Sequence, residues 1–373
     1  MLHNRIHRYT LWSLTLLSPI APLMGQAEPT LEAHVLPSLF DDRTATVALD
    51  INDQGQIVGW STNSAEKTRA TLWNQQGEPR RLACPEGTTE CSAVAINDSG
   101  NVVGDATPVR FSQEYAFIVR WNPNGEVSRV TTPPANGILA AYANDISDQG
   151  FVVGSAEAYT FGDDAGAQRA TLWRRNGAPT KKLRPLVGAS GTALTSDAVA
   201  VNDNRLSPRL VVGVTRYASN VNIATAWDRN GRARALPPLS GHDSSQAHSV
   251  NRQGTVAGIS QLPILEDDGY VFRVSTAVAW GSNGRPVALK LMSGCSQSSA
   301  EEINDAGFVV GSNSACAGRP GDVAVIWNPE GDVFELPLPA GFIEGEALAI
   351  NSQGDVVGYA VERKGKTVAI VWR

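Results

Sequence analysis

The feature that most constrains the fold of this chain is a twelve-residue motif that occurs seven times. Its clearest copy is Ala-Leu-Ala-Ile-Asn-Ser-Gln-Gly-Asp-Val-Val-Gly, from Ala347 to Gly358. The copies begin at Ala48, Ala93, Ala143, Ala198, Ala247, Ala300 and Ala347. Self-similarity at a spacing of about 45 to 55 residues is typical of a repeat array, in which one supersecondary unit is copied and stacked.

Each copy opens with a predicted hairpin. The first segment is Ala-x-x-Ile or Ala-x-x-Val, and Asn-Asp-x-Gly or a relative follows it, as at Asn52 to Gly55. Asn and Asp initiate turns through their own backbone and glycine accepts positive φ, so this segment predicts a tight turn. The fourth copy departs from the pattern, because Asn202 runs on through Arg209.

The second segment, Val-Val-Gly or similar, ends in a glycine in every copy. These glycines are Gly59, Gly104, Gly154, Gly213, Gly258, Gly311 and Gly358. Glycine weakens a strand, so its recurrence predicts that another group approaches closely at this position.

The third segment ends in tryptophan in all seven copies: Trp73, Trp121, Trp173, Trp227, Trp280, Trp327 and Trp372. We interpret these residues as packing between sheets, and a sugar-binding platform is the alternative. After six of them a second turn, x-x-x-Gly, leads to a fourth apolar segment. Four short strands per copy and no helical periodicity predict the blades of a β-propeller.

The seventh copy ends at Trp372 and lacks a fourth strand. Val35-Leu36-Pro37 matches Ala235-Leu236-Pro237, which belongs to a fourth strand. We therefore predict an all-β, seven-bladed β-propeller with four antiparallel strands per blade. Residues near 33–39 pair with 367–373, so the N-terminal strand completes the last blade and removes two exposed edges. A loose N-terminal extension is the alternative. The expected blades lie near 44–90, 91–140, 141–195, 196–245, 246–297, 298–344, and 345–373 plus 30–40.

The first 27 residues lie outside the repeats. They carry Arg5 and Arg8, no acidic residue, and an apolar run from Leu11 to Leu23. This pattern predicts a cleaved signal peptide at 1–27 and a single domain at 28–373, secreted or periplasmic. A membrane anchor is the alternative, but the run is short for a bilayer.

Four cysteines, Cys84, Cys91, Cys295 and Cys316, are an even number for an exported chain. Pairing of sequence neighbours predicts the disulfides Cys84–Cys91 and Cys295–Cys316. A zinc site is the rival interpretation, but the CxxC spacing is absent. We expect no metal and no cofactor.

The formal net charge is −6, and removing the two leader arginines leaves −8. This balance argues against nucleic acid or an anionic membrane as the main partner. Arg174-Arg175 and Lys181-Lys182 lie beside turn signals, and we interpret them as solvated charge, with a binding patch as the alternative.

Strand order predicts two faces, with the tight turns on one and loops of variable length on the other. We expect recognition on the variable-loop face, because rigid scaffolds carry it on irregular loops. The candidates lie in the loops Thr160–Gln168 and Gln261–Val274: Phe161, Asp163, Asp164, Glu266, Asp267, Asp268, Tyr270 and Phe272. Acidic residues beside aromatic ones fit a sugar, a peptide or Ca²⁺. Solvated loop charge is the plainer alternative.

Two histidines are further candidates. His242 stands in Gly241-His242-Asp243-Ser244, where acid, base and nucleophile types are adjacent, although adjacency is weak evidence for a catalytic triad. His248 lies in a first strand, as do Asp50, Asp145 and Glu302. These four side chains are candidates for a shared metal or catalytic cluster at the central channel.

The motif Ala-x-x-Ile-Asn-x-x-Gly-x-Val-Val-Gly followed by x-Ala-x-x-Trp resembles the HAF-repeat family of extracellular bacterial repeat proteins. Tyr115-Ala116-Phe117 and Arg69-Ala70-Thr71-Leu72-Trp73 approximate the segment that gives the family its name. The resemblance implies export and a repeat fold, and no catalytic residues. We expect a monomeric, non-catalytic binding or scaffold protein that recognises a glycan or protein on the variable-loop face. The alternatives are a glycosidase or polysaccharide lyase on the same scaffold and a structural envelope component.

Overall fold

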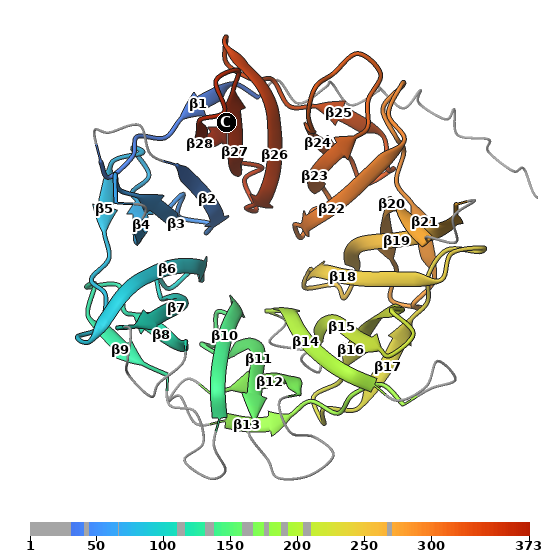
Figure 1. The fold of residues 1–373 in the computed structure, drawn as a ribbon, viewed down its shortest axis with the longest axis horizontal. Coiled ribbons are helices and arrows are strands. Elements are labelled where there is room, and N and C mark those ends of the chain that lie inside the picture. Colours follow the sequence, from blue (N-terminus) through green and yellow to red (C-terminus); the bar gives the residue numbers. More distant parts are fainter. Residues whose placement is uncertain are drawn as a thin grey trace, which may run out of the picture. The chain divides into compact units, whose positions relative to one another are not determined.

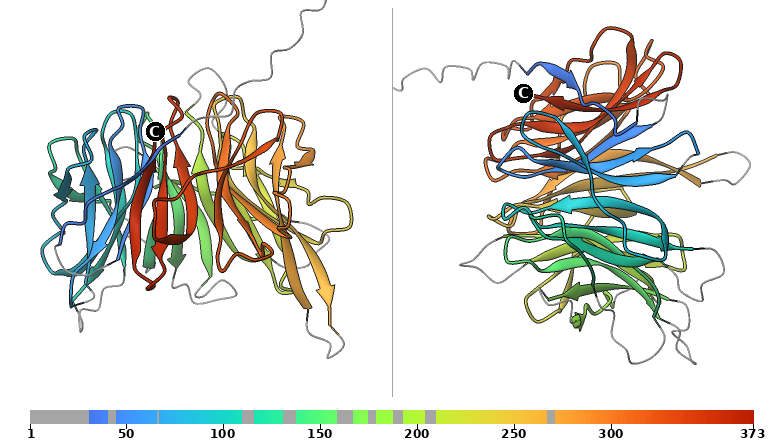
Figure 2. Two further views of the ribbon diagram at one scale, coloured as in Figure 1. Left: turned by 90° about the horizontal axis from the view of Figure 1, so that it is seen from above. Right: turned by 90° about the vertical axis from the view of Figure 1, so that its left-hand side faces the viewer.

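The computed structural model describes residues 31–40, 45–65, 67–109, 116–130, 138–158, 167–174, 179–187, 193–203, 210–266 and 271–373. Within these ranges the chain is all-β and contains no helix. Seven sheets of four antiparallel strands form a ring (Figure 1), and their first strands line a central cavity. The first strand of each sheet is innermost (Figure 1). In both views of Figure 2 the sheets lie beside one another around the ring. The predicted seven-bladed β-propeller is confirmed.

The blades are numbered here from the chain's start. Blade 1 contains β2 (Thr46–Ile51), β3 (Ile57–Thr62), β4 (Thr68–Trp73) and β5 (Pro79–Arg81). Blade 2 contains β6 (Thr88–Ile96), β7 (Val102–Pro108), β8 (Phe117–Trp121) and β9 (Val127–Arg129). Blade 3 contains β10 (Ile138–Ile146), β11 (Val152–Ala158), β12 (Gln168–Trp173) and β13 (Pro179–Lys182). Blade 4 contains β14 (Ala193–Val201), β15 (Val211–Tyr217), β16 (Asn222–Trp227) and β17 (Ala233–Leu236).

Blade 5 contains β18 (Ser244–Val250), β19 (Val256–Leu265), β20 (Val271–Trp280) and β21 (Pro286–Ala288). Blade 6 contains β22 (Gln297–Ile303), β23 (Val309–Ser314), β24 (Val323–Trp327) and β25 (Val333–Glu335). Blade 7 contains β26 (Phe342–Ile350), β27 (Val356–Glu362), β28 (Thr367–Trp372) and, from the other end of the chain, β1 (Ala33–Val35).

The ring is closed by β1, which pairs antiparallel with β28. The register sets Ala33 opposite Trp372 and Val35 opposite Ile370. Leu36, the next residue, is 4% exposed and packs between blades 7 and 1. The predicted closure is confirmed, and its cause is the removal of two sheet edges together with the burial of Leu36.

The repeated strand glycines lie against the innermost strand. A Cβ placed on Gly59 would be 2.0 Å from the carbonyl oxygen of Val47, and the other six glycines show the same contact at 1.9–2.1 Å. At this point the first strand shifts register by one residue, for example between Ala48 and Asp50. This bulge brings the two backbones too close for any side chain, which explains the glycine in every copy.

The seven repeated tryptophans are 0% exposed, which confirms that they are core residues. They also fasten the blades together, because the indole N–H donates to a backbone carbonyl of the preceding blade. Trp227 Nε1 lies 2.6 Å from the Arg184 oxygen and Trp327 Nε1 lies 2.7 Å from the Lys290 oxygen. The same bond joins Trp73 to Pro37, Trp121 to Ala83, Trp280 to Pro237 and Trp372 to Pro337. For Trp173, the position that corresponds to these acceptors in the repeat is 131, which lies outside the described residues.

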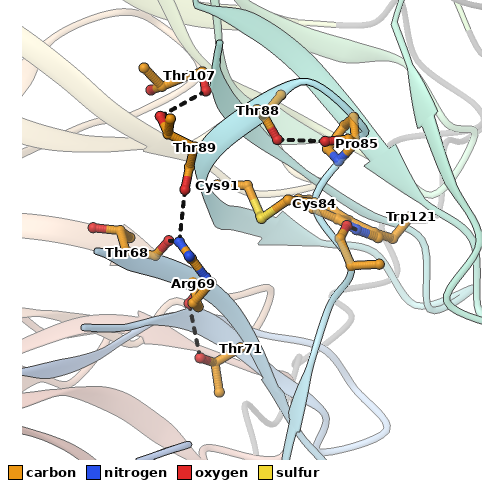
Figure 3. The surroundings of a disulfide bond; sticks show 11 residues. Thr68, Arg69, Thr71, Cys84, Pro85, Thr88, Thr89, Cys91, Thr107 and Trp121 are labelled. Carbon is orange, nitrogen blue, oxygen red and sulfur yellow. Dashed lines mark hydrogen bonds between the residues drawn. A yellow bond between two sulfur atoms is a disulfide. The ribbon is translucent and has the colours of Figure 1, made fainter. Parts of the chain in front are cut away.

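Both predicted disulfides are confirmed. Cys84–Cys91 links the segment after β5 to β6, and Figure 3 shows it beside Trp121. Nearby, the Arg69 guanidinium donates to the Thr89 carbonyl at 2.9 Å and so joins blades 1 and 2 (Figure 3). Cys295–Cys316 joins the segments that precede β22 and follow β23. Disulfides indicate an oxidising, exported environment. In the described part of the chain, no helix has the length and apolar character needed to cross a bilayer.

Candidate functional site

A cavity of about 450 Å³ occupies the tight-turn end of the central channel. Every blade contributes to its wall through the innermost strand and the turn that follows. Because the first strand carries the repeated motif, the cavity wall consists of equivalent positions from the seven copies, and several of these positions hold different residues in different copies.

The structure brings the sequence candidates Asp50, Asp145, Glu302 and His248 together on this wall. Each carboxylate also accepts a backbone N–H of the following blade. Asp50 accepts from Ile96 at 2.7 Å, Asp145 from Val201 at 2.8 Å and Glu302 from Ile350 at 2.7 Å. The second oxygens of Asp50 and Asp145 accept from Ile51 and Ile146 in their own strands, at 2.7 and 2.6 Å. These acids therefore hold adjacent blades together.

Burial raises the pKa of these carboxyls, because desolvation disfavours the charged form. The pKa of Asp50 rises to about 6 and that of Asp145 to about 7, against the lowering effect of the N–H donors. The pKa of Glu302 is also raised well above its ordinary value, by burial and then by the charge of Asp50. Asp50 and Asp145 therefore change charge near neutral pH.

A second layer of carboxylates encircles the mouth of the cavity. It consists of aspartates at the second position of the turn in five copies: Asp53, Asp98, Asp203 and Asp305 follow an asparagine, and Asp148 follows Ser147. Each accepts the turn N–H of the preceding blade; Asp98 accepts from Asp53 at 2.9 Å and Asp148 from Asp98 at 3.0 Å. The remaining bonds are Asp148 to Asp203, Arg252 to Asp305 and Ser352 to Asp53.

The turn asparagines form a parallel belt. Asn52 Nδ2 donates to the Asn97 carbonyl at 3.1 Å, and Asn351 Nδ2 donates to the Asn52 carbonyl at 3.2 Å across the closure of the ring. Asn97, Asn251 and Asn304 make the same bond to the next blade. Sequence analysis interpreted Asn-Asp only as turn formers and missed this role. A signal existed, since many turn formers would suit a hairpin but Asn recurs in six of seven copies.

Arg252 stands in blade 5 where five other copies have aspartate. Its guanidinium lies 3.2 Å from Asp305 of blade 6, 3.4 Å from Asp148 of blade 3 and 3.8 Å from Asp98 of blade 2. One side chain therefore reaches across the mouth and neutralises part of the carboxylate ring. Burial together with neighbouring carboxylates raises the pKa of Asp203 to about 7.

His248 is the one histidine on the cavity wall. Its Nδ1 lies 3.1 Å from Glu301 Oε2 and 2.9 Å from the Ala300 carbonyl. The imidazolium lowers the pKa of Glu301 to about 2 in spite of burial, and the carboxylate raises the pKa of His248. The pair is a partly buried ionic contact between blades 5 and 6.

The candidates on the variable-loop face fall in two groups. Phe161, Asp163, Asp164, Asp267, Asp268 and Tyr270 lie outside the described residues. Glu266 and Phe272 are exposed at the end of a long hairpin, in which β19 and β20 stay paired as far as Leu265 and Val271. The segment expected as a loop from Gln261 is thus mostly strand, because Ile264, Val271 and Phe272 continue the ladder.

His242 lies at the base of this hairpin, where its Nδ1 is 3.0 Å from Ser260 Oγ. The neighbouring Asp243 pairs with Arg273 of β20 through both carboxylate oxygens, at 2.9 and 3.0 Å. Ser244 is buried and accepts from the Asn222 N–H. His242 and Asp243 therefore contact β19 and β20 at the base of the hairpin, whereas Ser244 contacts β16 of the neighbouring blade.

Most of the exposed large apolar side chains among the described residues lie at the variable-loop ends of the strands. Ten such residues occur in the described part of the chain, and seven of them lie in these loops or in the strand ends beside them. The seven are Val109, Val187, Leu194, Leu265, Val271, Phe272 and Leu291. None of the ten lies in the described tight turns.

Comparison with known proteins identifies the fold and leaves the activity open. Residues 81–210 match a family described as a protein of unknown function (DUF3466). No curated protein matches the sequence. Among solved structures, a puromycin hydrolase mutant has a TM-score of 0.53 at 14% identity over 88% of this chain and 52% of its own. This chain therefore spans about half the length of that hydrolase. The BP39L lectin of Burkholderia pseudomallei has a TM-score of 0.50 at 11% identity, over 91% of this chain and 98% of its own. These likenesses show the propeller fold.

Proposed function

We propose that this chain is an exported, non-catalytic binding protein that recognises a protein partner through its variable-loop face. The observation that supports it is the cluster of exposed apolar side chains on the β19–β20 hairpin, where Leu265 is paired with Val271 and Phe272 is the next residue. Apolar side chains exposed side by side on a protein surface mark sites of interaction. The proposal includes a signal peptide at 1–27 and kinship with the HAF-repeat proteins, and the two disulfides support an exported destination.

The β19–β20 hairpin is the centre of the proposed surface. Leu265 is 71% exposed, and Val271 and Phe272 are 41% and 38% exposed. The Asp243–Arg273 ion pair and the bond from Gln261 Nε2 to Ser275 Oγ at 3.1 Å hold the base of the hairpin. A braced hairpin presents apolar side chains with little ordering entropy to lose on binding. Aliphatic residues outnumber the single described aromatic one, which favours a protein over a sugar ring.

The channel acids support a binding role over catalysis. Both oxygens of Asp50 and of Asp145 are occupied by backbone N–H groups, which leaves them poorly placed to attack or protonate a substrate. Arg252 lies across the mouth that a substrate would enter. The acids fasten the ring, and the recognition surface lies at the opposite end of the strands.

The test is a capture experiment with a matched control on the same blade. Mature protein is immobilised and exposed to the envelope and secreted fractions of the source organism, and bound proteins are identified by mass spectrometry. Leu265→Ser should abolish capture of a specific protein, whereas Val287→Ser, 64% exposed on β21, should not. Specific binding to a glycan array that survives Leu265→Ser would contradict the proposal.

One observation favours a second candidate, a glycosidase or polysaccharide lyase. Glu302 lies on the cavity wall with a raised pKa, as a general acid requires, and within the described residues a backbone N–H, that of Ile350, donates to only one of its carboxylate oxygens. Paired carboxyls in a pocket are the common apparatus of glycoside hydrolysis. A polysaccharide screen decides the matter, because turnover that is lost in Glu302→Gln would establish the enzyme and overturn the binding proposal.

A further inference from the structure

The junction between blades 3 and 4 has an arginine at each of two positions that hold an ion pair at the matching junction between blades 5 and 6. We call two positions at each junction between blades its corner positions. One is the residue, just after the fourth strand of the first blade, whose carbonyl accepts the indole N–H of the next blade's repeated tryptophan. The other is the residue that follows the glycine of the turn between the third and fourth strands of that next blade. Between blades 5 and 6 these are Lys290 and Asp332, which form an ion pair. Between blades 3 and 4 they are Arg184 and Arg232.

The backbone geometry of the two junctions is the same. The Arg184 N–H donates to the Gly231 carbonyl at 3.2 Å, and the Lys290 N–H donates to the Gly331 carbonyl at 3.1 Å. Arg232 follows Gly231 directly, as Asp332 follows Gly331. At three other described junctions the corner pairs are Ala83 with Glu126, Pro37 with Glu78 and Pro237 with Arg285. Within the described residues, the blade 3–4 corner is the one at which both positions carry a cationic side chain.

Arg229, in the same turn as Arg232, adds a third exposed guanidinium. We name Arg184, Arg229 and Arg232 the arginine patch. Arg234 follows on β17, and Arg174 stands in the equivalent turn of blade 3. None of these five arginines has a carboxylate within 4.0 Å among the described residues. The local acid, Asp228, accepts two N–H groups of its own turn through Oδ1, at 2.8 and 2.9 Å; these bonds and the charge of Arg232 lower its pKa, so one carboxylate offsets part of the charge of the three arginines.

We propose that the arginine patch is a docking site for an acidic polysaccharide. Like charges side by side are unfavourable unless an anion joins them, and the arginine fork fits carboxylates and sulfates through paired hydrogen bonds. The whole chain carries −6, so a basic corner is a local departure from its charge. The site lies on the turns and outer strands, away from the apolar variable-loop face.

Charge and surroundings select a polysaccharide over other polyanions. Single-stranded nucleic acid would be gripped by stacking on exposed aromatic rings, and the described residues of this turn and of β17 include none. A membrane surface would call for apolar side chains beside the cations, and the turn from Asp228 to Arg232 has none. An acidic glycan needs only spaced guanidinium groups and is present outside cells.

The test uses immobilised polygalacturonate and two charge-matched double variants. Arg184→Gln/Arg232→Gln should weaken binding about tenfold, the equivalent of losing one good charged contact. Lys290→Gln/Arg285→Gln removes the same charge from corner positions of blade 5 and should leave affinity within about twofold. Binding of the native protein should fall as NaCl rises. Thermal unfolding of both variants checks that each is folded.

A gain-of-binding variant keeps the test decisive if the patch variant folds poorly. Asp332→Arg recreates the two-cation corner beside Lys290 and should raise affinity for polygalacturonate. Absence of binding by the native protein at low salt would overturn the proposal, as would equal losses in the two double variants. Tighter binding to duplex DNA or to phosphatidylglycerol vesicles than to polygalacturonate would also overturn it.

Discussion

Replacing Arg252 with alanine should destabilise the ring, and the deficit should depend on salt. The guanidinium contacts Asp305, Asp148 and Asp98 at 3.2, 3.4 and 3.8 Å, and its side chain is 46% exposed. Partly exposed ion pairs contribute about 0.2–1 kcal/mol each, so three contacts amount to about 1–3 kcal/mol. For a chain of this size that loss lowers Tm by about 2–4 °C.

The assay is thermal unfolding followed by circular dichroism at pH 8. In about 10 mM NaCl the variant leaves five aspartates around the mouth without their cation, and the Tm deficit should be largest. In about 1 M NaCl charges are screened within about 3 Å, and the deficit should shrink. It should also shrink at pH 5, because the pKa of Asp98 and of Asp203 is raised and protonation relieves repulsion.

The control is Arg285→Ala, which removes an exposed arginine from another turn of blade 5 and should change Tm by less than about 1 °C. If Arg252→Ala matches the native protein at low salt, Arg252 is not the cation that balances the ring. A deficit that grows with salt would refute the electrostatic reasoning as well, since screening can only weaken these contacts.

Three further predictions concern the fasteners between and within blades. First, stability should rise as pH falls from 8 to 5. In the folded state the pKa of Asp50 is about 6 and that of Asp145 is about 7, and both exceed the pKa of an aspartate in the unfolded chain. The folded state therefore binds more protons than the unfolded state in this pH range, which stabilises it. The gain should be about 2–4 kcal/mol by denaturant titration, and a flat profile would contradict it. Second, Trp227→Phe should lower the free energy of unfolding by about 2–3 kcal/mol, because the Arg184 carbonyl loses its donor and a cavity remains. Trp60→Phe, outside the tryptophan repeat, is the control, and equal losses in the two variants would argue against a contribution from the indole hydrogen bond. Third, Gly311→Ala should lower the free energy of unfolding by more than about 3 kcal/mol, because its Cβ would lie 2.0 Å from the Ser299 carbonyl oxygen. Gly318→Ala introduces a Cβ at positive φ without a close contact and should lower it by less. A larger loss in Gly318→Ala would contradict the crowding argument.

The sequence predicted those parts of the fold that repeat. Seven tryptophans and seven strand glycines predicted the four-stranded blade, and the missing fourth strand of the last copy predicted the pairing of Val35 with Ile370. The two disulfide pairings could also be predicted, because cysteines that are nearest neighbours in the sequence lie close together in the propeller. Each of these features leaves a signal within one copy or in the difference between copies.

The contacts between blades left weaker signals. The Asn52 amide bonds to Asn97 and the Asp50 carboxylate bonds to Ile96, in each case about one repeat away. Such partners are set by the packing angle of adjacent blades, which no local pattern encodes. Sequence analysis therefore placed Asp50, Asp145, Glu302 and His248 near the channel without finding that backbone groups already occupy the acids.

Arg252 and Arg184 show how two site features that sequence analysis did not identify could have been found. Arg252 replaces an aspartate that five copies share, and Arg232 stands where blade 6 has Asp332. Aligning the copies against one another exposes both departures. Their meaning needed the structure, because only the ring places Arg252 opposite Asp148 and Arg184 beside the Arg232 turn.

The claim that the variable-loop face carries recognition is tested most directly by site-specific photo-crosslinking. A photoreactive residue is placed at Leu265, 71% exposed on the hairpin, or at Val287, 64% exposed on the outer strand of the same blade. Irradiation in the presence of the source organism's envelope fraction should yield one specific adduct from position 265 and none from position 287. Adducts from position 287 alone, or from neither position, would contradict the account.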